Sequence, residues 1–315
     1  MNSPRLLIGL SAVMVALKEG EPLVLVSRRP SGEDSLPFGP FDPVNHRTFD
    51  LSLRGWVREQ TGFEIGYVEQ LYTFGDKDRD VPEATLTDTP TGARVISIGY
   101  LALTPEARPA GASFDARWQD WYHYFPWEDH RTRRPPILDA EIAPRLKTWA
   151  AGNERRLERA RLAFGLDGAR WIEERVLERY ELLYEAGLVA ECTRDAELPD
   201  TGVRLGASMA SDHRRILATG LTRLRGKIKY RPVVFELMPD RFTLSALQRS
   251  AEGILGLQLH TQNFRRALEK AQLVAGTGQM ETGTGGRPAE LFSFRRDHAS
   301  SISAPGLTAP RRSPD

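Results

Sequence analysis

The chain of 315 residues has one cysteine, Cys192, and no long apolar run. A single cysteine excludes an intramolecular disulfide and a cysteine-based zinc site, and it favours a reducing cytoplasm. We interpret it as a small buried apolar residue and not as a nucleophile. No apolar run reaches the roughly 18 residues that span a membrane, so we expect no membrane partner. The apolar N-terminus has neither the basic start nor the cleavage site of a signal peptide and predicts a buried strand.

The chain also has almost no net charge, because 43 basic residues oppose 42 acidic ones. The charges are unevenly placed: residues 210–297 hold 15 basic and 8 acidic residues, which is a net charge of +7 and leaves −6 for the remainder. This asymmetry is expected when one domain meets a polyanion and another does not. A solvated basic surface without a ligand gives the same count, so charge alone leaves both interpretations open.

The first hundred residues alternate between strand and helix patterns. Runs rich in Val, Leu and Ile predict strands, the first two of which form a hairpin. These strands are residues 7–17, 22–28, 66–74 and 94–103. Residues 47–60 have helical spacing, with Leu53, Trp56 and Val57 on one face, and Gly62 is suited to the position just past the helix. The order of elements is that of an α+β domain.

The middle of the chain begins with an aromatic-rich stretch at 114–136. Two long helices follow in the prediction, about 139–164 and 168–190, either as an α-hairpin packed on the first domain or as a dimer contact. The aromatic stretch also holds four residues that resemble metal ligands only by type: His123, Glu128, Asp129 and His130. Because their spacing matches no known metal site, we interpret them as structural or surface residues.

The C-terminal part has the order of a winged helix-turn-helix. We predict a basic helix at 209–226, a short strand at 232–238, a helix beginning near Thr243, a second helix capped by Thr261, and a final hairpin. In that arrangement the second helix of the turn lies in the DNA major groove, and the wing reaches toward the backbone or the minor groove.

The predicted recognition helix begins TQNFRR. Amide, hydroxyl and guanidinium groups of this helix and of the wing can meet base edges and phosphates. The predicted DNA-binding residues are Thr261, Gln262, Asn263, Arg265, Arg266, Lys270 and Arg287. Phe264, Leu268 and Leu273 fall on the opposite side and are predicted core residues. The alternative is an amphipathic helix whose arginines are merely solvated.

Residues 51–63, LSLRGWVREQTGF, resemble the end of the Nudix pyrophosphatase box, G-x5-E-x7-R-E-U-x-E-E-x-G-U, where U is aliphatic. With Gly62 on the penultimate glycine, Trp56 replaces a glutamate, Arg47 falls on the first glutamate, and Glu59 is the metal-binding carboxylate that survives. One carboxylate holds Mg²⁺ weakly, since the ion needs several oxygen ligands. The resemblance therefore implies no hydrolysis, no catalytic residue and no metal site. Trp56 is either a core residue or a new wall of a ligand pocket.

Further segments extend the likeness. GYVEQLYTFGDKDRD with ARVISIGYLAL, and FTLSALQRSAEGILG with QNFRRALEKAQLV and GRPAELFSF, together resemble the Nudix-related transcriptional regulators of NAD metabolism. The length of 104–209 is similar to the longer subgroup that controls de novo NAD synthesis. The resemblance implies an α+β fold: a Nudix-like α/β/α sandwich with a mixed sheet, a helical insertion and a C-terminal winged helix-turn-helix. The expected units are a sensor domain, a helical hairpin with linker, a DNA-binding domain and a disordered Ser/Pro-rich tail, at residues 1–138, 139–208, 209–297 and 298–315.

The same resemblance implies a cytoplasmic, homodimeric repressor of NAD biosynthesis genes that binds a double-stranded DNA operator. It requires no cofactor and senses an NAD-related adenine nucleotide such as ADP-ribose, NAD or ATP. The residues implied for the effector are Arg28, Arg29 and Arg94 for phosphates, Tyr72 and Phe74 for adenine, and Glu59 or Asp80 for a ribose hydroxyl or a residual metal. The alternative is a Nudix-type hydrolase of nucleoside diphosphate derivatives that uses Glu69 or Glu83, with the basic domain as a nucleic-acid or protein adaptor.

Overall fold

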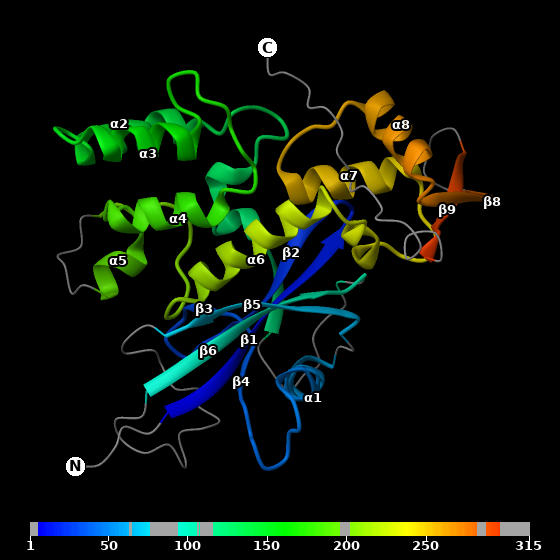
Figure 1. Ribbon diagram of the computed structural model, residues 1–315, viewed down its shortest axis with the longest axis horizontal. Coiled ribbons are helices and arrows are strands. Elements are labelled where there is room, and N and C mark those ends of the chain that lie inside the picture. The colour runs from blue at the N-terminus through cyan, green and yellow to red at the C-terminus, as the bar shows by residue number, and fades with distance from the viewer. Residues whose placement is uncertain are drawn as a thin grey trace.

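A twisted mixed sheet forms the centre of the molecule (Figure 1). The computed structural model describes residues 6–62, 65–75, 94–105, 107, 116–195, 202–281 and 288–296, without the side chain of Gln60. The strands of this sheet are β1 (Leu6–Lys18), β2 (Glu21–Arg28), β3 (Asp34–Ser35), β4 (Phe38–Pro40), β5 (Tyr67–Phe74), β6 (Arg94–Leu103) and β7 (Ala116–Asp120). The strand order is β3-β2-β1-β6-β5, with β4 paired to β1 and β7 paired to β2.

The hairpin of β1 and β2 confirms the first sequence prediction. Its two-residue turn is Glu19-Gly20, and both residues have positive φ, 56° and 92°. Such a turn matches the natural twist of the two strands. Strand β1 also pairs in parallel with β6 from Leu6↔Arg94 to Val15↔Leu103. The central strands are therefore buried on both faces, which explains their continuous apolar sequence.

Helix α1 (Phe49–Thr61) covers one face of the sheet, as its sequence predicts. The Thr48 side chain accepts a hydrogen bond from the Leu51 amide at 3.2 Å and caps the first turn. Gly62 ends the helix at φ 73°, a left-handed conformation that glycine adopts without strain. Leu53, Trp56 and Val57 pack into the apolar cluster on this face.

Helix α6 (His213–Ile228) covers the opposite face, and the sheet lies between it and α1 (Figure 1). Its buried side includes Ile216, Leu217 and Leu221. At Gly220 an added Cβ would lie 2.9 Å from Cγ1 of Val13, so the helix backbone closely approaches β1. The helix that the sequence assigns to the DNA-binding unit therefore shares a core with the sheet.

The helical insertion differs from the prediction of two long helices. It consists of the π-helical turn η4 (Leu138–Ile142), α2 (Ala143–Trp149), α3 (Glu154–Phe164), α4 (Val176–Glu185) and α5 (Ala190–Asp195). The first predicted helix breaks at Gly152, which has φ 75°, and Asn153 caps α3 by accepting from the Arg156 amide. The second predicted helix begins only at Val176. The prediction was wrong because apolar spacing alone does not reveal these breaks.

The C-terminal part contains η5 (Val233–Leu237), α7 (Leu244–Leu255), α8 (Thr261–Ala271), β8 (Val274–Glu281) and β9 (Ala289–Phe294). The predicted strand at 232–238 was wrong, since this segment forms the 3-10 helix η5. Its Phe235 ring stacks on Phe294 with centroids 4.2 Å apart. A short, mostly buried and apolar run suits a strand or a helix equally well. An isolated antiparallel bridge joins Phe242 to Phe292 beside the wing.

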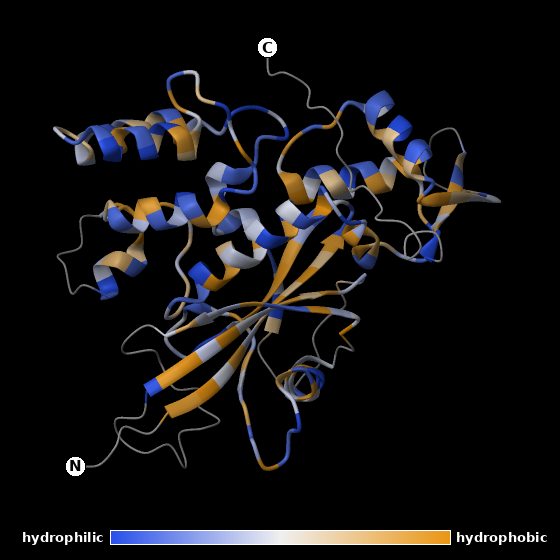
Figure 2. Cartoon of the chain, in the orientation of Figure 1, coloured by the Kyte–Doolittle hydropathy of each residue, from blue (hydrophilic) through white to orange (hydrophobic). Residues whose placement is uncertain are grey.

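Hydropathy follows these layers (Figure 2). Strands β1 and β6 are largely hydrophobic, whereas α8 alternates between hydrophilic and hydrophobic sides. Within the described residues, none of the helices is long and apolar enough to cross a membrane.

Candidate functional site

Helix α8 presents a polar side to solvent and an apolar side to the core. Thr261, Gln262, Arg265, Arg266 and Lys270 are exposed, and Asn263 is half-buried. Phe264 and Leu268 are buried, as is Leu273 just past the helix. The structure thus brings six of the predicted DNA-binding residues together on one helix. The seventh, Arg287, lies outside the described residues.

Hydrogen bonds fix the turn between α7 and α8. Thr243 caps α7 by accepting from the Ala246 amide at 3.1 Å. The Glu252 carboxylate accepts from the Leu259 amide at 2.9 Å, and the Gln248 amide group donates to the Leu259 carbonyl at 3.1 Å. Thr261 is the first helical residue and not the cap that the sequence predicts, because His260 occupies the cap position. These bonds hold the exposed side of α8 in a fixed orientation to α7.

Much of the basic charge predicted to face DNA is internal. Arg214 and Arg225 are fully buried. Their guanidinium groups pair with Glu191 at 3.2 Å and with Glu128 at 2.6 Å. Further along α6 and just past it, cations pair with acidic residues of the sheet and the insertion: Arg215 with Glu181, Lys227 with Glu69, and Lys229 with Glu173. The net charge of the segment therefore overstates its surface charge. The exposed cations of the segment include those of α8 and, outside it, Arg241, Arg249, Arg295 and Arg296.

The residues predicted to bind an effector lie on different parts of the sheet. Arg28 is the last residue of β2 and is exposed. Side chains of a strand alternate between its two faces, so Arg28 lies on the same face as Val24 and Val26, which is the face covered by α6. Arg94 begins β6 on the α1 face, in alternation with Ile98, and donates to the Gly75 carbonyl at 2.9 Å. The structure does not bring these two arginines together.

The other predicted effector residues are also dispersed. Glu59 is exposed on α1, and Arg29 is half-buried after β2. On β5, Tyr72 is exposed and Phe74 is buried, and their rings meet edge to face with centroids 5.7 Å apart. Asp80 lies outside the described residues. The role of these residues in binding an effector stays a prediction.

Trp56, which replaces a glutamate of the Nudix box, is a core residue. It is 6% exposed and belongs to the cluster under α1. A Cβ added at Gly39 would lie 2.7 Å from Cγ of the indole, so the ring fills the space beside the β4 backbone. Among the described residues, the indole Nε1 has no hydrogen-bond partner. At this position of the Nudix box the chain therefore has a packed core side chain in place of a metal-binding carboxylate.

The alternative catalytic carboxylate, Glu69, is already engaged. It accepts from Lys227 at 2.5 Å and from the Tyr67 hydroxyl at 2.7 Å. Burial raises the pKa of Glu69, but the hydrogen bonds from Lys227 and Tyr67 outweigh it and lower the pKa overall. Glu83 lies outside the described residues. Over the described parts of the chain, no group of three or more His, Cys, Asp or Glu residues is placed to hold a metal ion.

A pocket of about 420 Å³ lies at the edge of the sheet beside the insertion. Its lining comes from β2, β3 and the loop between them, from β7 and η2 (Trp121–His123), from the start of α5, and from the segment 204–208. The charged and imidazole groups in the lining are Arg28, Glu33, Asp34, Arg117, His123 and Arg204. Of these residues, sequence reasoning assigned only Arg28 to an effector, and it treated His123 as a structural or surface residue, because the segments that meet here lie far apart in the chain.

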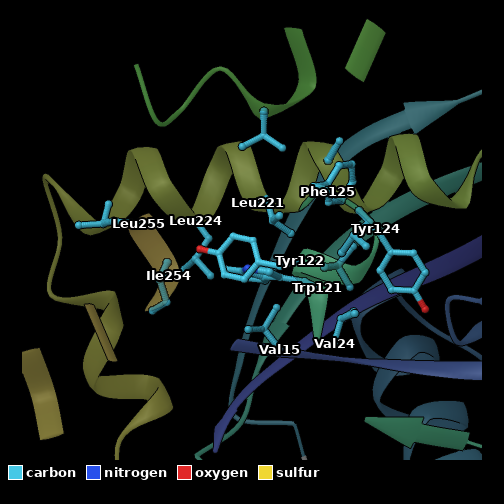
Figure 3. Packing of buried hydrophobic residues seen from close by; sticks show 14 of the residues in the cluster. Val15, Val24, Trp121, Tyr122, Tyr124, Phe125, Leu221, Leu224, Ile254 and Leu255 are labelled. Carbon is cyan, nitrogen blue, oxygen red and sulfur yellow. The ribbon is translucent and has the colours of Figure 1, made fainter. Parts of the chain in front are cut away.

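The aromatic segment 121–130 joins the sheet to α7. Trp121 and Tyr122 lie between β1, β2 and α6, next to Ile254 of α7 (Figure 3). The Tyr122 hydroxyl donates to the Gly253 carbonyl at 2.7 Å, and the His130 amide donates to the Gly256 carbonyl at 2.8 Å. The segment, which includes η3 (Pro126–Glu128), therefore contacts the end of α7 directly.

Two comparisons with known sequences concern part of the chain. Residues 234–294 match the family model of the NrtR DNA-binding winged helix domain. The ADPR responsive transcriptional repressor NtrR of Acinetobacter baylyi is 38% identical over 90 residues, which is 29% of this chain and 36% of the relative. The match thus spans about a third of the length of that relative.

Solved structures extend the comparison to the whole fold. The crystal structure of Shewanella oneidensis NrtR complexed with a 27mer DNA matches with a TM-score of 0.57 and 20% identity, over 96% of this chain and 99% of that one. A MutT/nudix family protein from Enterococcus faecalis matches with a TM-score of 0.51 and 17% identity, over 94% and 88%. At these identities the likeness shows the fold. The predicted α+β architecture, with a Nudix-like part and a winged helix, is confirmed, as is the resemblance to the Nudix-related regulators of NAD metabolism.

Proposed function

We propose that the protein is a DNA-binding transcriptional repressor of NAD biosynthesis genes that responds to an NAD-related adenine nucleotide. The observation that carries the proposal is the polar side of α8, within a segment that matches the NrtR winged helix domain. Gln262 and Asn263 offer donors and acceptors to base edges, and Arg265 and Arg266 offer cations to guanine or phosphate. The relative from Acinetobacter baylyi, an ADPR responsive repressor, supports ADP-ribose as the first effector to test.

We also propose that the protein is a cytoplasmic homodimer. Paired half-sites one helical turn apart need two recognition helices related by symmetry. The proposed units are the sensor at 1–138, the helical insertion with linker at 139–208, and the DNA-binding unit at 209–297. Since α6 of the third unit packs on the sheet of the first, the sensor and DNA-binding units share a core. An effector that favours one arrangement of this core would change the spacing of the two recognition helices.

The Nudix-like part acts as a receptor and not as a hydrolase. Trp56 fills the position of one glutamate of the box, and Glu69 is held in ion pairs with α6. The effector residues proposed from the sequence remain candidates, namely Arg28, Arg29, Glu59, Tyr72, Phe74, Asp80 and Arg94.

The test combines DNA binding with a search for turnover. DNA from upstream of NAD biosynthesis genes is titrated with the full chain, with and without ADP-ribose, and fluorescence anisotropy reports the affinity. We expect specific binding that ADP-ribose alters. Incubation with ADP-ribose and Mg²⁺ should yield no AMP. Turnover that disappears in Glu59→Gln would show a hydrolase instead.

A further inference from the structure

We infer that Glu269, on the exposed side of α8, is a specificity-determining residue that accepts a hydrogen bond from the N4 amino group of a cytosine in the major groove. This inference rests on the proposed function, because it takes α8 as the recognition helix. Glu269 is not among the DNA-binding residues predicted from the sequence. It would narrow the set of DNA sequences that the protein recognises and would add nothing to the attraction for phosphates.

Glu269 lies on the line of side chains that points farthest from the core. Phe264 and Leu268 define the buried side of α8, opposite its hydrophilic side (Figure 2). At about 100° per residue, the positions opposite this buried side are Gln262, Arg266 and Glu269, and all three side chains are exposed. Their spacing of i, i+4 and i+7 places them on one helix face. These three side chains therefore form the ridge of α8 that would enter the major groove most deeply.

The cations beside this ridge suit a different role. Arg265 and Lys270 are exposed, one on each flank of the ridge. A helix in the major groove has a phosphate backbone on either side, so flanking cations meet phosphates. Such contacts fix the position of the helix but carry no sequence information. The reading of base edges is thus left to the ridge.

The length of the ridge matches a short run of base pairs. With a rise of about 1.5 Å per residue, Gln262 and Glu269 lie about 10 Å apart along the helix axis. Base pairs are stacked about 3.4 Å apart, so a helix along the groove presents these two side chains to bases about three pairs apart. The amide of Gln262 suits adenine, and the guanidinium of Arg266 suits guanine. The carboxylate of Glu269 only accepts hydrogen bonds, which suits the N4 amino group of cytosine.

No contact within the described residues accounts for an acidic side chain at this position. The Glu269 carboxylate forms no hydrogen bond or ion pair with any of them, although Arg265 and Arg266 lie one turn away. Glu269 is also near the C-terminal end of α8, where the helix dipole disfavours a negative charge. Facing DNA, the carboxylate repels phosphates. A base edge that donates to Glu269 explains the acid, and sequences that present an acceptor there are rejected.

Binding-site selection with the full chain tests the role of Glu269. The wild type and Glu269→Gln are each incubated with a pool of duplexes of random sequence, and the bound DNA is sequenced. The wild type should enrich a site with cytosine at one fixed position of each half-site. Glu269→Gln should lose the cytosine at that position alone and gain adenine, because an amide group pairs with adenine. A substitution that only disturbed the packing of α8 would change several positions together.

Fluorescence anisotropy on the enriched site gives the magnitude. Replacement of the cytosine by thymine, with its pairing base, should weaken wild-type binding about tenfold, within the usual range for one mismatched base pair. For Glu269→Gln the two affinities should be close to equal. Glu154→Gln is the matched control, since it removes an exposed acidic charge from α3, which lies well apart from α8 (Figure 1). It should keep the wild-type site and affinity.

The outcomes separate the role of Glu269 from the proposed function. If the wild type and Glu269→Gln enrich the same site, or if Glu269→Gln changes a position that holds no cytosine, the reading of cytosine is overturned and the DNA-binding repressor is kept. If the wild type enriches no sequence, the repressor is overturned, and the reading of cytosine with it. Loss of the cytosine in Glu269→Gln, with the rest of the site intact, supports both.

Discussion

Arg225 on α6 and Glu128 at the end of η3 form a fully buried ion pair, with Nη1 2.6 Å from Oε2. The same carboxylate pairs with Arg179 of α4 at 2.6 Å, and Arg225 Nε donates to the Ile254 carbonyl of α7 at 2.8 Å. One carboxylate thus links the aromatic segment, the insertion and α6, and through Arg225 the winged helix. From the sequence, Glu128 has the residue type of a metal ligand, but its spacing favours a structural or surface role. The structure places it at this junction.

Removal of the Glu128 charge should destabilise the whole chain. Burial raises the pKa of Glu128, but Arg179 and Arg225 outweigh it and hold the pKa below its ordinary value, so the carboxylate is charged at neutral pH. Glu128→Gln leaves two buried guanidinium groups without their counter-ion, which typically costs about 3–5 kcal/mol. Urea unfolding measures this loss. Glu158→Gln, which breaks the exposed pair with Arg161, is the control and should unfold like the wild type.

His130 should make the stability depend on pH. Burial lowers the pKa of His130 from its ordinary 6.5 to about 4, although the Glu128 carboxylate opposes the shift. The unfolded chain therefore binds a proton at a pH where the folded chain does not. The resulting stability is complete above pH 6.5 and is lost as the pH falls towards 4.

A variant isolates this effect. His130→Phe keeps a ring on Trp171, whose centroid lies 4.0 Å from that of His130. Between pH 6.5 and 4 the free energy of unfolding of the wild type should fall relative to this variant by up to about 1.4 kcal/mol per pH unit. Parallel curves for the two proteins would show that His130 titrates normally.

Gly39 and Trp56 should be energetically coupled. In the wild type, Gly39→Ala puts a methyl group against the indole, and such overpacking typically costs about 1–3 kcal/mol. In the Trp56→Ala background the same methyl group has space, so the cost should shrink or vanish. A double-mutant cycle by chemical denaturation measures the difference. Equal costs in both backgrounds would mean that the indole does not pack on β4.

The elements that the sequence predicts well are those with local causes. Helix α1 has its apolar face, its Thr48 cap and its Gly62 terminus within one short stretch, and the β1–β2 hairpin has its turn between two apolar runs. Helices α7 and α8 follow the same rule. The polar side of α8 is equally local, because exposure there follows directly from helical spacing.

The features that sequence reasoning missed depend on distant contacts. The buried arginines look like surface charge until Glu128 and Glu191 are placed beside them. Arg117 and Arg204 reach one pocket from segments almost ninety positions apart in the chain. Segment 233–237 has a single polar residue, Glu236, which is too little to show a period, and its contact with the wing through Phe235 and Phe294 is not visible in the local sequence.

The salt dependence of DNA binding by α8 variants tests the proposed repressor most directly. Arg265→Ala and Arg266→Ala should each weaken binding to upstream DNA and reduce the slope of log affinity against log salt by about 1, because each removes one cation from phosphate or base. Arg47→Ala, an exposed arginine before α1, should keep the wild-type affinity and slope. Wild-type affinity and slope in both α8 variants would contradict the assignment of α8 as the recognition helix.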